Sequence, residues 1–234
     1  MQDLDSRVDR LSHRRQTLPE LAEIAELRTR REEAANNVVV AQTEVDDLGR
    51  EQRKADADVE QVKNRRARDQ QRLDRGQVGS PKELQTLQHE IETLERRISD
   101  LEDAELDVME RLETAQSDLE RLQGSITEYD DSLRGLEQRR DAAMTEIDAE
   151  VREAEHERAQ IVTNIPDELL KLYERLRGSH GGVGAAALKQ RRCQGCQLEL
   201  NAADLREIAA AAEDEVLRCE ECQRILVRTG ESGI

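Results

Sequence analysis

The chain has 234 residues, of which 38% are charged and 1% aromatic, and its formal net charge is −17. A wide globular core is excluded, because large rings supply much of the area that such cores bury and the chain has no Phe and no Trp. The acidic balance argues against wholesale wrapping by nucleic acid or an anionic membrane, and the absence of an apolar leader or a long apolar run predicts a cytoplasmic protein without a membrane span.

The first part of the chain predicts a short helix, a break and a long helix. Leu4, Val8 and Leu11 recur at helical spacing. The segment 17–20 (Thr-Leu-Pro-Glu) resembles a capping box with an internal proline, which places a break there. A thin apolar seam follows, interrupted by Gln52, Arg66 and Asp69. Its members are Val38, Ala41, Val45, Leu48, Ala55, Val59, Val62 and Leu73.

A turn is predicted at about residues 75–81. Gly76 and Gly79 end the first long helix, and Ser80-Pro-Lys-Glu83 begins the next, with serine as N-cap and glutamate reaching back. A short break between two matched seams favours an antiparallel hairpin. The alternative is a parallel dimer of longer rods.

The second long helix carries the clearest pattern in the chain. From Leu84 to Leu136 apolar residues alternate at spacings of three and four over about seven heptads, and only Glu105 breaks the series. This period indicates a coiled coil and excludes disorder for this half. The fold class is therefore mainly α, a long antiparallel coiled-coil hairpin followed by a different, smaller C-terminal domain.

The last fifty residues change character. Residues 166–177 predict a connecting helix opened by a proline, and 178–184 a glycine-rich connector. Alternating apolar residues predict short strands at 197–200 and 224–227, and Asn201 can cap a helix reaching about Ala211. The expected domains are a hairpin over 1–165 and, over 166–234, a connecting helix with a small domain that holds all four cysteines.

Two Cys-x-x-Cys pairs predict the zinc ribbon. Cys193 and Cys196 form the first pair and Cys219 and Cys222 the second, with 22 residues between the pairs. Each pair can form a knuckle that directs two thiolates at one ion, and four thiolates suit one tetrahedral, structural zinc. A rubredoxin-like iron site and disulfides are the alternatives. Four protein ligands leave no open position, so the metal would support folding rather than activate water.

A small basic patch on the ribbon predicts a surface that binds the phosphates of nucleic acid. Its members flank the two knuckles: Lys189, Arg191, Arg192, Arg224 and Arg228. No aromatic side chain is available there to stack on bases, since the only rings of this kind are Tyr129 and Tyr173. Ordinary solvated charge is the alternative interpretation.

Three stretches resemble a known bacterial family, the coiled-coil proteins with a C-terminal four-cysteine zinc ribbon, and among these the actinobacterial members. They are the turn segment 78–91, the acidic stretch 100–110 and the two cysteine knuckles. The second knuckle departs from the family's usual Cys-Pro-x-Cys-Gly, because Glu220 and Gln223 replace the proline and the glycine. The resemblance implies an adaptor: relatives in flagellated bacteria act as chaperones for an alternative sigma factor, bind a transcript and contact flagellar export components, and a chlamydial relative is linked to type III secretion.

The leading hypothesis is a non-enzymatic adaptor that binds protein partners through the helical arm and protein or nucleic acid through the ribbon, as a monomer or a dimer. A nucleic-acid-binding regulator is the alternative. A polymerase-channel factor is less favoured, because such factors present acidic residues at the hairpin tip and this tip offers only Asp74 beside Arg75. No nucleophile–base pair or phosphate-binding glycine loop suggests an enzyme.

Overall fold

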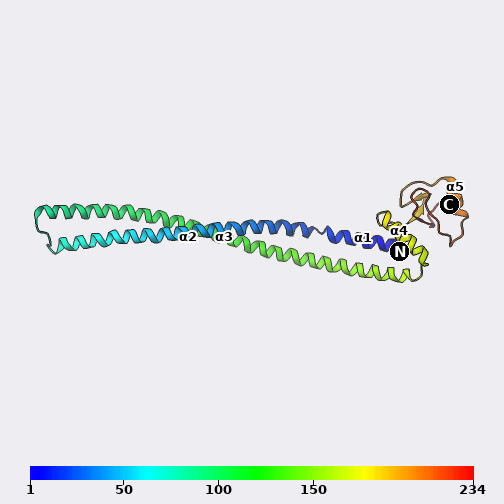
Figure 1. The fold of residues 1–234 in the computed structure, drawn as a ribbon, viewed down its shortest axis with the longest axis horizontal. Helices are drawn as coiled ribbons and strands as arrows, with labels where there is room; N and C mark the ends of the chain where they lie inside the picture. Colours follow the sequence, from blue (N-terminus) through cyan, green and yellow to red (C-terminus); the bar gives the residue numbers. More distant parts are fainter. The chain divides into compact units, whose positions relative to one another are not determined.

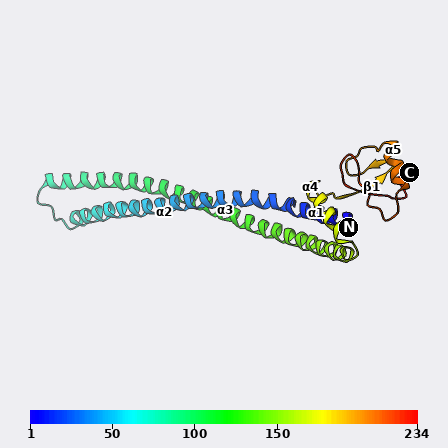
Figure 2. The same ribbon diagram turned by 45° about the vertical axis from the view of Figure 1, so that its right-hand side comes forward.

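The computed structural model describes residues 1–234 and is mainly helical (Figures 1 and 2). The elements in chain order are α1 (Gln2–Gln16), α2 (Pro19–Asp74), α3 (Pro81–Val162), α4 (Asp167–Ser179), β1 (Ala185–Lys189), β2 (Arg192–Cys193), α5 (Ala202–Ala210) and β3 (Ile225–Val227). None of these helices combines the length and the apolar composition that crossing a bilayer requires.

The backbone contacts divide the chain into two compact units. The hairpin unit comprises Glu23–Leu136, and the base unit comprises Met1–Ala22 together with Glu137–Ile234. The helices α2 and α3 contribute residues to both units, whereas the cysteines belong to the base unit.

In the hairpin unit, α2 and α3 lie side by side and run antiparallel (Figure 1), which confirms the predicted hairpin. Between them Gly76 adopts a φ of 66°, a conformation that glycine takes without steric cost. The hydroxyl of Ser80 accepts a hydrogen bond from the backbone N–H of Glu83 at 3.3 Å, as an N-cap should. The carboxylate of Glu83 accepts from the N–H of Gly79 at 2.9 Å, one residue further back than a standard capping box.

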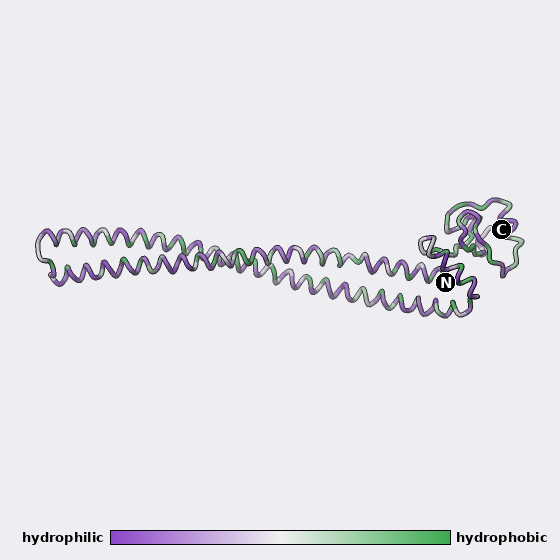
Figure 3. The backbone as a smooth tube through the Cα atoms, viewed as in Figure 1, coloured by the Kyte–Doolittle hydropathy of each residue, from purple (hydrophilic) through white to green (hydrophobic).

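A narrow apolar seam and flanking ion pairs hold the two helices together. Buried seam residues include Leu48, Val59 and Val108, and along the helices hydrophobic residues recur within a largely hydrophilic sequence (Figure 3). Cross-helix ion pairs flank the seam, such as Lys63 to Glu102 at 2.7 Å. The pairs are exposed, so each adds little free energy, and the seam carries most of the stability.

The heptad break at Glu105 faces a second carboxylate. The side chain of Glu105 shares a hydrogen bond with Asp56 across the seam, and this bond, with some burial, raises the pKa of Glu105. A proton held between two carboxylates is the physical reason for that shift. We therefore expect this position to stabilise the seam less than an apolar residue would.

In the base unit the predicted break after α1 is confirmed, since α1 ends at Gln16 and α2 begins at Pro19. Leu11 and Leu18 on either side of the break pack against Ile147 of α3, which is fully buried. The connecting helix is also confirmed as α4.

The zinc ribbon contains a three-stranded sheet in the order β2-β1-β3. β1 pairs antiparallel with β2 and parallel with β3. The strand expected at 224–227 is confirmed as β3, but the strand expected at 197–200 is wrong. Gln197 adopts a φ of 67°, which ends the first knuckle, and only an isolated bridge from Glu199 to Arg192 remains. The strands β1 and β2 were not anticipated.

The helix α5 begins as predicted, with Asn201 as its N-cap. The side-chain oxygen of Asn201 accepts hydrogen bonds from the N–H groups of Ala203 at 2.8 Å and Asp204 at 3.0 Å. Leu205 and Ile208 face inward and join the ribbon core around Cys193 and Cys219.

Candidate metal centre

Each cysteine pair sits in a knuckle closed by backbone hydrogen bonds. In the first, the N–H of Gln197 donates to the carbonyl of Cys193 at 2.8 Å, and in the second the N–H of Gln223 donates to the carbonyl of Cys219 at 2.7 Å. Such a turn directs both thiol side chains to the same side.

Both knuckles end in the same way, on a glutamine in the left-handed conformation. The φ angle is 67° at Gln197 and 61° at Gln223. Each glutamine side-chain amide donates back to a carbonyl three residues earlier, that of Gln194 at 2.8 Å and that of Glu220 at 3.1 Å. This local bond offsets part of the cost of placing Gln223 in left-handed backbone, which disfavours longer side chains.

The fold brings the four predicted cysteines together. All four sulfur atoms lie within 4.8 Å of one another, and the distance is 3.9 Å both from Cys193 to Cys222 and from Cys196 to Cys219. A tetrahedron with zinc–sulfur bonds of about 2.3 Å places sulfur atoms about 3.8 Å apart. The residues present therefore fit one zinc ion, and the sulfur atoms are too far apart for a disulfide.

Burial keeps two of the thiols protonated in the absence of metal. Cys193 and Cys219 are fully buried, and burial raises the pKa of Cys193 and raises that of Cys219 to about 12. Burial alone would also raise the pKa of Cys222, but hydrogen bonds from the backbone and side chain of Arg224 and from neighbouring thiols lower it to about 7. A metal ion must displace these protons, so its binding supplies folding free energy and depends on pH.

Arg224 organises the second knuckle. Besides its bond to Cys222, its guanidinium donates to the carbonyls of Val183 at 2.8 Å and His180 at 3.1 Å. The arginine side chain lies against Gly195, where an added Cβ would approach the arginine Cδ to 2.7 Å. Gly195 is therefore needed for this close approach.

Every basic residue of the predicted phosphate patch has an acceptor within the ribbon. Lys189 pairs with Glu231 at 2.6 Å, Arg192 pairs with Glu199 at 3.6 Å, and Arg191 donates to the carbonyl of Gly233 at 3.2 Å. These residues remain largely exposed.

Arg228 forms hydrogen bonds at the C-terminal end of α5. Its guanidinium donates to the carbonyls of Ile208 at 3.0 Å and Ala211 at 2.7 Å, which lie at the C-terminal end of α5. Arg224 and Arg228 thus have structural contacts, and the use of the patch for nucleic acid stays a prediction.

A buried polar network that the sequence did not reveal joins the ribbon to the helices. Asp5 of α1 is only 2% exposed, and its carboxylate accepts from the hydroxyl of Tyr173 at 2.5 Å and from Arg158 of α3 at 2.6 Å. The side-chain oxygen of Gln2 accepts from the N–H groups of Gly184 at 2.8 Å and Ala185 at 3.2 Å, where β1 begins. The pattern of α1 offered no signal for this, because Asp5 lies among other charged residues.

Comparison with known proteins places these features in a family. A model of the CT398-like coiled coil hairpin domain matches residues 1–181, and a model of the C4-type zinc ribbon domain matches residues 192–226. Together with the geometry above, the second match shows that the C-terminal segment is a zinc ribbon with four cysteines for one structural zinc.

Individual relatives agree with these matches. The uncharacterized protein Rv2229c of Mycobacterium tuberculosis is 34% identical over 225 residues, which cover 96% of this chain and 91% of the relative. A solved structure from Mycobacterium smegmatis matches with a TM-score of 0.81 and 33% identity, over 97% of this chain and 94% of the other. The structure of CT398 from Chlamydia trachomatis has a TM-score of 0.66 at 20% identity over the same shares, which indicates a common fold.

Proposed function

Since the chain belongs to the family of CT398-like coiled-coil hairpin proteins with a C4-type zinc ribbon, we propose that it is an adaptor. In this proposal the hairpin binds a protein partner, and the ribbon binds a second protein or nucleic acid. The domains found fit a non-enzymatic scaffold, and the finer assignment rests on the contacts described below.

The observation that carries the proposal is the hydrogen-bond network that links the start of the ribbon to the helices within the base unit. Asp5, Tyr173 and Gln2 connect α1, α4 and the start of β1 through buried or half-buried hydrogen bonds. A free ribbon on a flexible connector would not need such a network, and burying a carboxylate is costly unless it is paired. Within the base unit the network ties the start of β1 to α1 and α4, so the ribbon is held on these helices.

The chemistry of the ribbon supports a structural role for the metal. Four thiolates fill a tetrahedral site, so the zinc has no position for a substrate or a reactive water. The ion would hold the knuckles in place so that the surface around them keeps one shape.

Affinity capture with the full-length protein from native lysate tests the proposal, with and without a zinc chelator. We expect a protein recovered in stoichiometric amount through the hairpin in both conditions, and loss of ribbon-dependent partners on chelation. A matched Cys196→Ser variant should reproduce the chelator result. Recovery of RNA alone, released by ribonuclease, would contradict the proposal and favour a nucleic-acid-binding protein.

A further inference from the structure

The middle of the hairpin unit is far more acidic than the rest of the chain. Residues 38–51 of α2 and 100–120 of α3 contain 13 acidic and two basic residues, a net charge of −11 out of −17 for the whole chain. The two segments face each other in the hairpin, as the ion pair between Arg111 and Glu51 shows. A coiled-coil seam does not need this charge, since its stability comes from the apolar positions.

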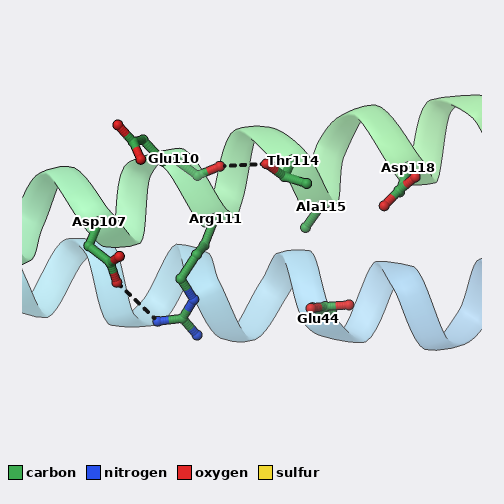
Figure 4. A pocket seen from close by; sticks show the side chains of 7 residues that line it. All are labelled: Glu44, Asp107, Glu110, Arg111, Thr114, Ala115 and Asp118. Atoms are coloured by element: carbon green, nitrogen blue, oxygen red, sulfur yellow. Dashed lines mark hydrogen bonds and ion pairs between the residues drawn. The ribbon is translucent and has the colours of Figure 1, made fainter.

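A hollow on one face of this segment runs between the two helices. It consists of two adjoining parts, of about 450 and 330 Å³, which share Glu44 of α2 and Arg111 of α3. Figure 4 shows Arg111 reaching from α3 toward α2 across this hollow. We call it the central groove and define it by Val39, Val40, Glu44, Glu110, Arg111 and Asp118.

The central groove combines exposed apolar surface with unpaired negative charge. Val39 and Val40 are 65% and 68% exposed, although the seam positions on either side of them, Val38 and Ala41, are partly buried. The single cation of the groove, Arg111, lies between two carboxylates, 3.7 Å from Glu51 and 3.8 Å from Asp107. The carboxylates of Glu44 and Glu110 form no ion pair or hydrogen bond in the structure. Arg111 does not neutralise them, because it already pairs with Glu51 and Asp107.

The exposed valines and the negative charge indicate what kind of molecule can bind in the central groove. A second copy of the chain would bring another −11 against this face, which like-charge repulsion disfavours. A nucleic acid would be repelled for the same reason. An amphipathic helix with an apolar stripe and flanking Lys or Arg would cover the valines and neutralise the free carboxylates.

We propose that the central groove binds a basic amphipathic helix of a protein partner. An apolar side chain of that helix packs over Val39 and Val40, and its cations pair with Glu44 and Glu110. This inference rests on the proposed adaptor function and assigns one of its binding surfaces. Because the charges are exposed, they mainly steer association and make it sensitive to salt.

Site-specific photo-crosslinking in the cells that make the protein tests this inference. Val40→p-benzoylphenylalanine places the probe in the groove, and Leu106→p-benzoylphenylalanine places it on a 55% exposed position of α3 that does not line the groove. We expect a protein crosslink at position 40 and not at 106, and mass spectrometry should map it to a net-positive amphipathic segment. In the same assay Glu44→Gln with Glu110→Gln should lower the yield at position 40 about fivefold, as the loss of two exposed ion pairs implies.

A matched control variant distinguishes the carboxylates of the groove from negative charge elsewhere on the hairpin. Glu32→Gln with Glu113→Gln removes one exposed carboxylate from each helix outside the groove and should leave the yield unchanged. An equal loss in both double variants would overturn the proposal, because it would show general attraction by charge.

The remaining outcomes separate the groove from the adaptor function. A crosslink at position 40 to a second copy, to nucleic acid or to a segment without net positive charge would overturn the groove proposal. Crosslinks only at position 106 would also overturn it while leaving the adaptor function standing. Absence of any protein crosslink at both positions, together with no protein recovered in the affinity capture, would refute both proposals.

Discussion

Replacing Asp5 by asparagine removes the charge at the centre of the base unit and keeps the size of the side chain. The carboxylate of Asp5 is buried and lies 2.5 Å from the hydroxyl of Tyr173 and 2.6 Å from Nε of Arg158, with Arg177 at 3.9 Å. The change removes the carboxylate that Arg158 and Arg177 share and leaves Arg158 paired with Glu174 and Arg177 with Asp9. It therefore tests whether this network holds α1, α3 and α4 together.

The expected loss follows from the burial of each partner. Removing one partner of a fully buried ion pair costs about 3–5 kcal/mol. The side chains of Arg158 and Arg177 are still 26% and 25% exposed, so water solvates them partly and reduces the cost. We expect Asp5→Asn to lower the free energy of unfolding of the base unit by about 2–3 kcal/mol.

Tyrosine fluorescence can follow this loss locally. The chain has two tyrosines and no tryptophan, so in a Tyr129→Phe background only Tyr173 reports. Urea unfolding in this background gives the free energy, and hydrogen exchange of the amides of residues 167–179 shows whether α4 loosens.

Asp148→Asn is the matched control. Asp148 also pairs with an arginine in the base unit, Arg15 at 3.1 Å, but its side chain is 38% exposed. This exposed pair should contribute only about 0–1 kcal/mol. If Asp5→Asn cost no more than Asp148→Asn, the buried network would not be what joins these helices, and the reasoning would be refuted.

Three further predictions concern the zinc, the tyrosine and the seam. Cys196→Ser or chelation should abolish stoichiometric zinc binding and unfold the ribbon. The circular dichroism signal at 222 nm should change by less than about a fifth, because most helical residues lie in α2 and α3. Loss of most of the helical signal would contradict this prediction. Burial and the bond to Asp5 raise the pKa of Tyr173, so the folded state holds the phenol proton more tightly than the unfolded state. The stability that this proton contributes is complete below about pH 10 and should decline as pH rises further. The midpoints of urea unfolding at pH 9 and pH 11, compared with those of Tyr173→Phe, measure this decline. Glu105→Leu should raise the melting temperature by about 2–4 °C, because it completes the heptads and removes a carboxylate facing Asp56. A lower melting temperature would show that the proton shared by Glu105 and Asp56 stabilises the seam.

Local patterns were sufficient for the hairpin and for the metal ligands. Leucines and isoleucines at alternating spacings of three and four predicted α3, because only a helix places them on one face. The segment Ser80-Pro-Lys-Glu83 predicted where α3 begins, because the cap depends on residues three apart. Two Cys-x-x-Cys pairs predicted the metal centre, because each knuckle is a local turn.

Short strands were harder to predict. The segment 197–200 has an alternating pattern, but the knuckle bond from Gln197 to Cys193 competes with a strand and prevails. The strand β1 consists of Ala185–Lys189, where alanines carry little strand preference, and it forms because β2 and β3 pair with it on both sides. Pairing between residues about forty positions apart leaves no periodic signal.

The amino-acid sequence by itself determined the coiled-coil hairpin and the four converging thiols, because spacing along one chain sets which face a side chain occupies. Only the tertiary structure decided that Asp5 accepts a hydrogen bond from Tyr173 and that Arg228 donates to a carbonyl at the end of α5. It also decided that Val40 and Glu44 border an open groove. These relations depend on which surfaces far apart in the chain are packed together and which remain exposed, and burial then decides whether a charge is structural or free to bind.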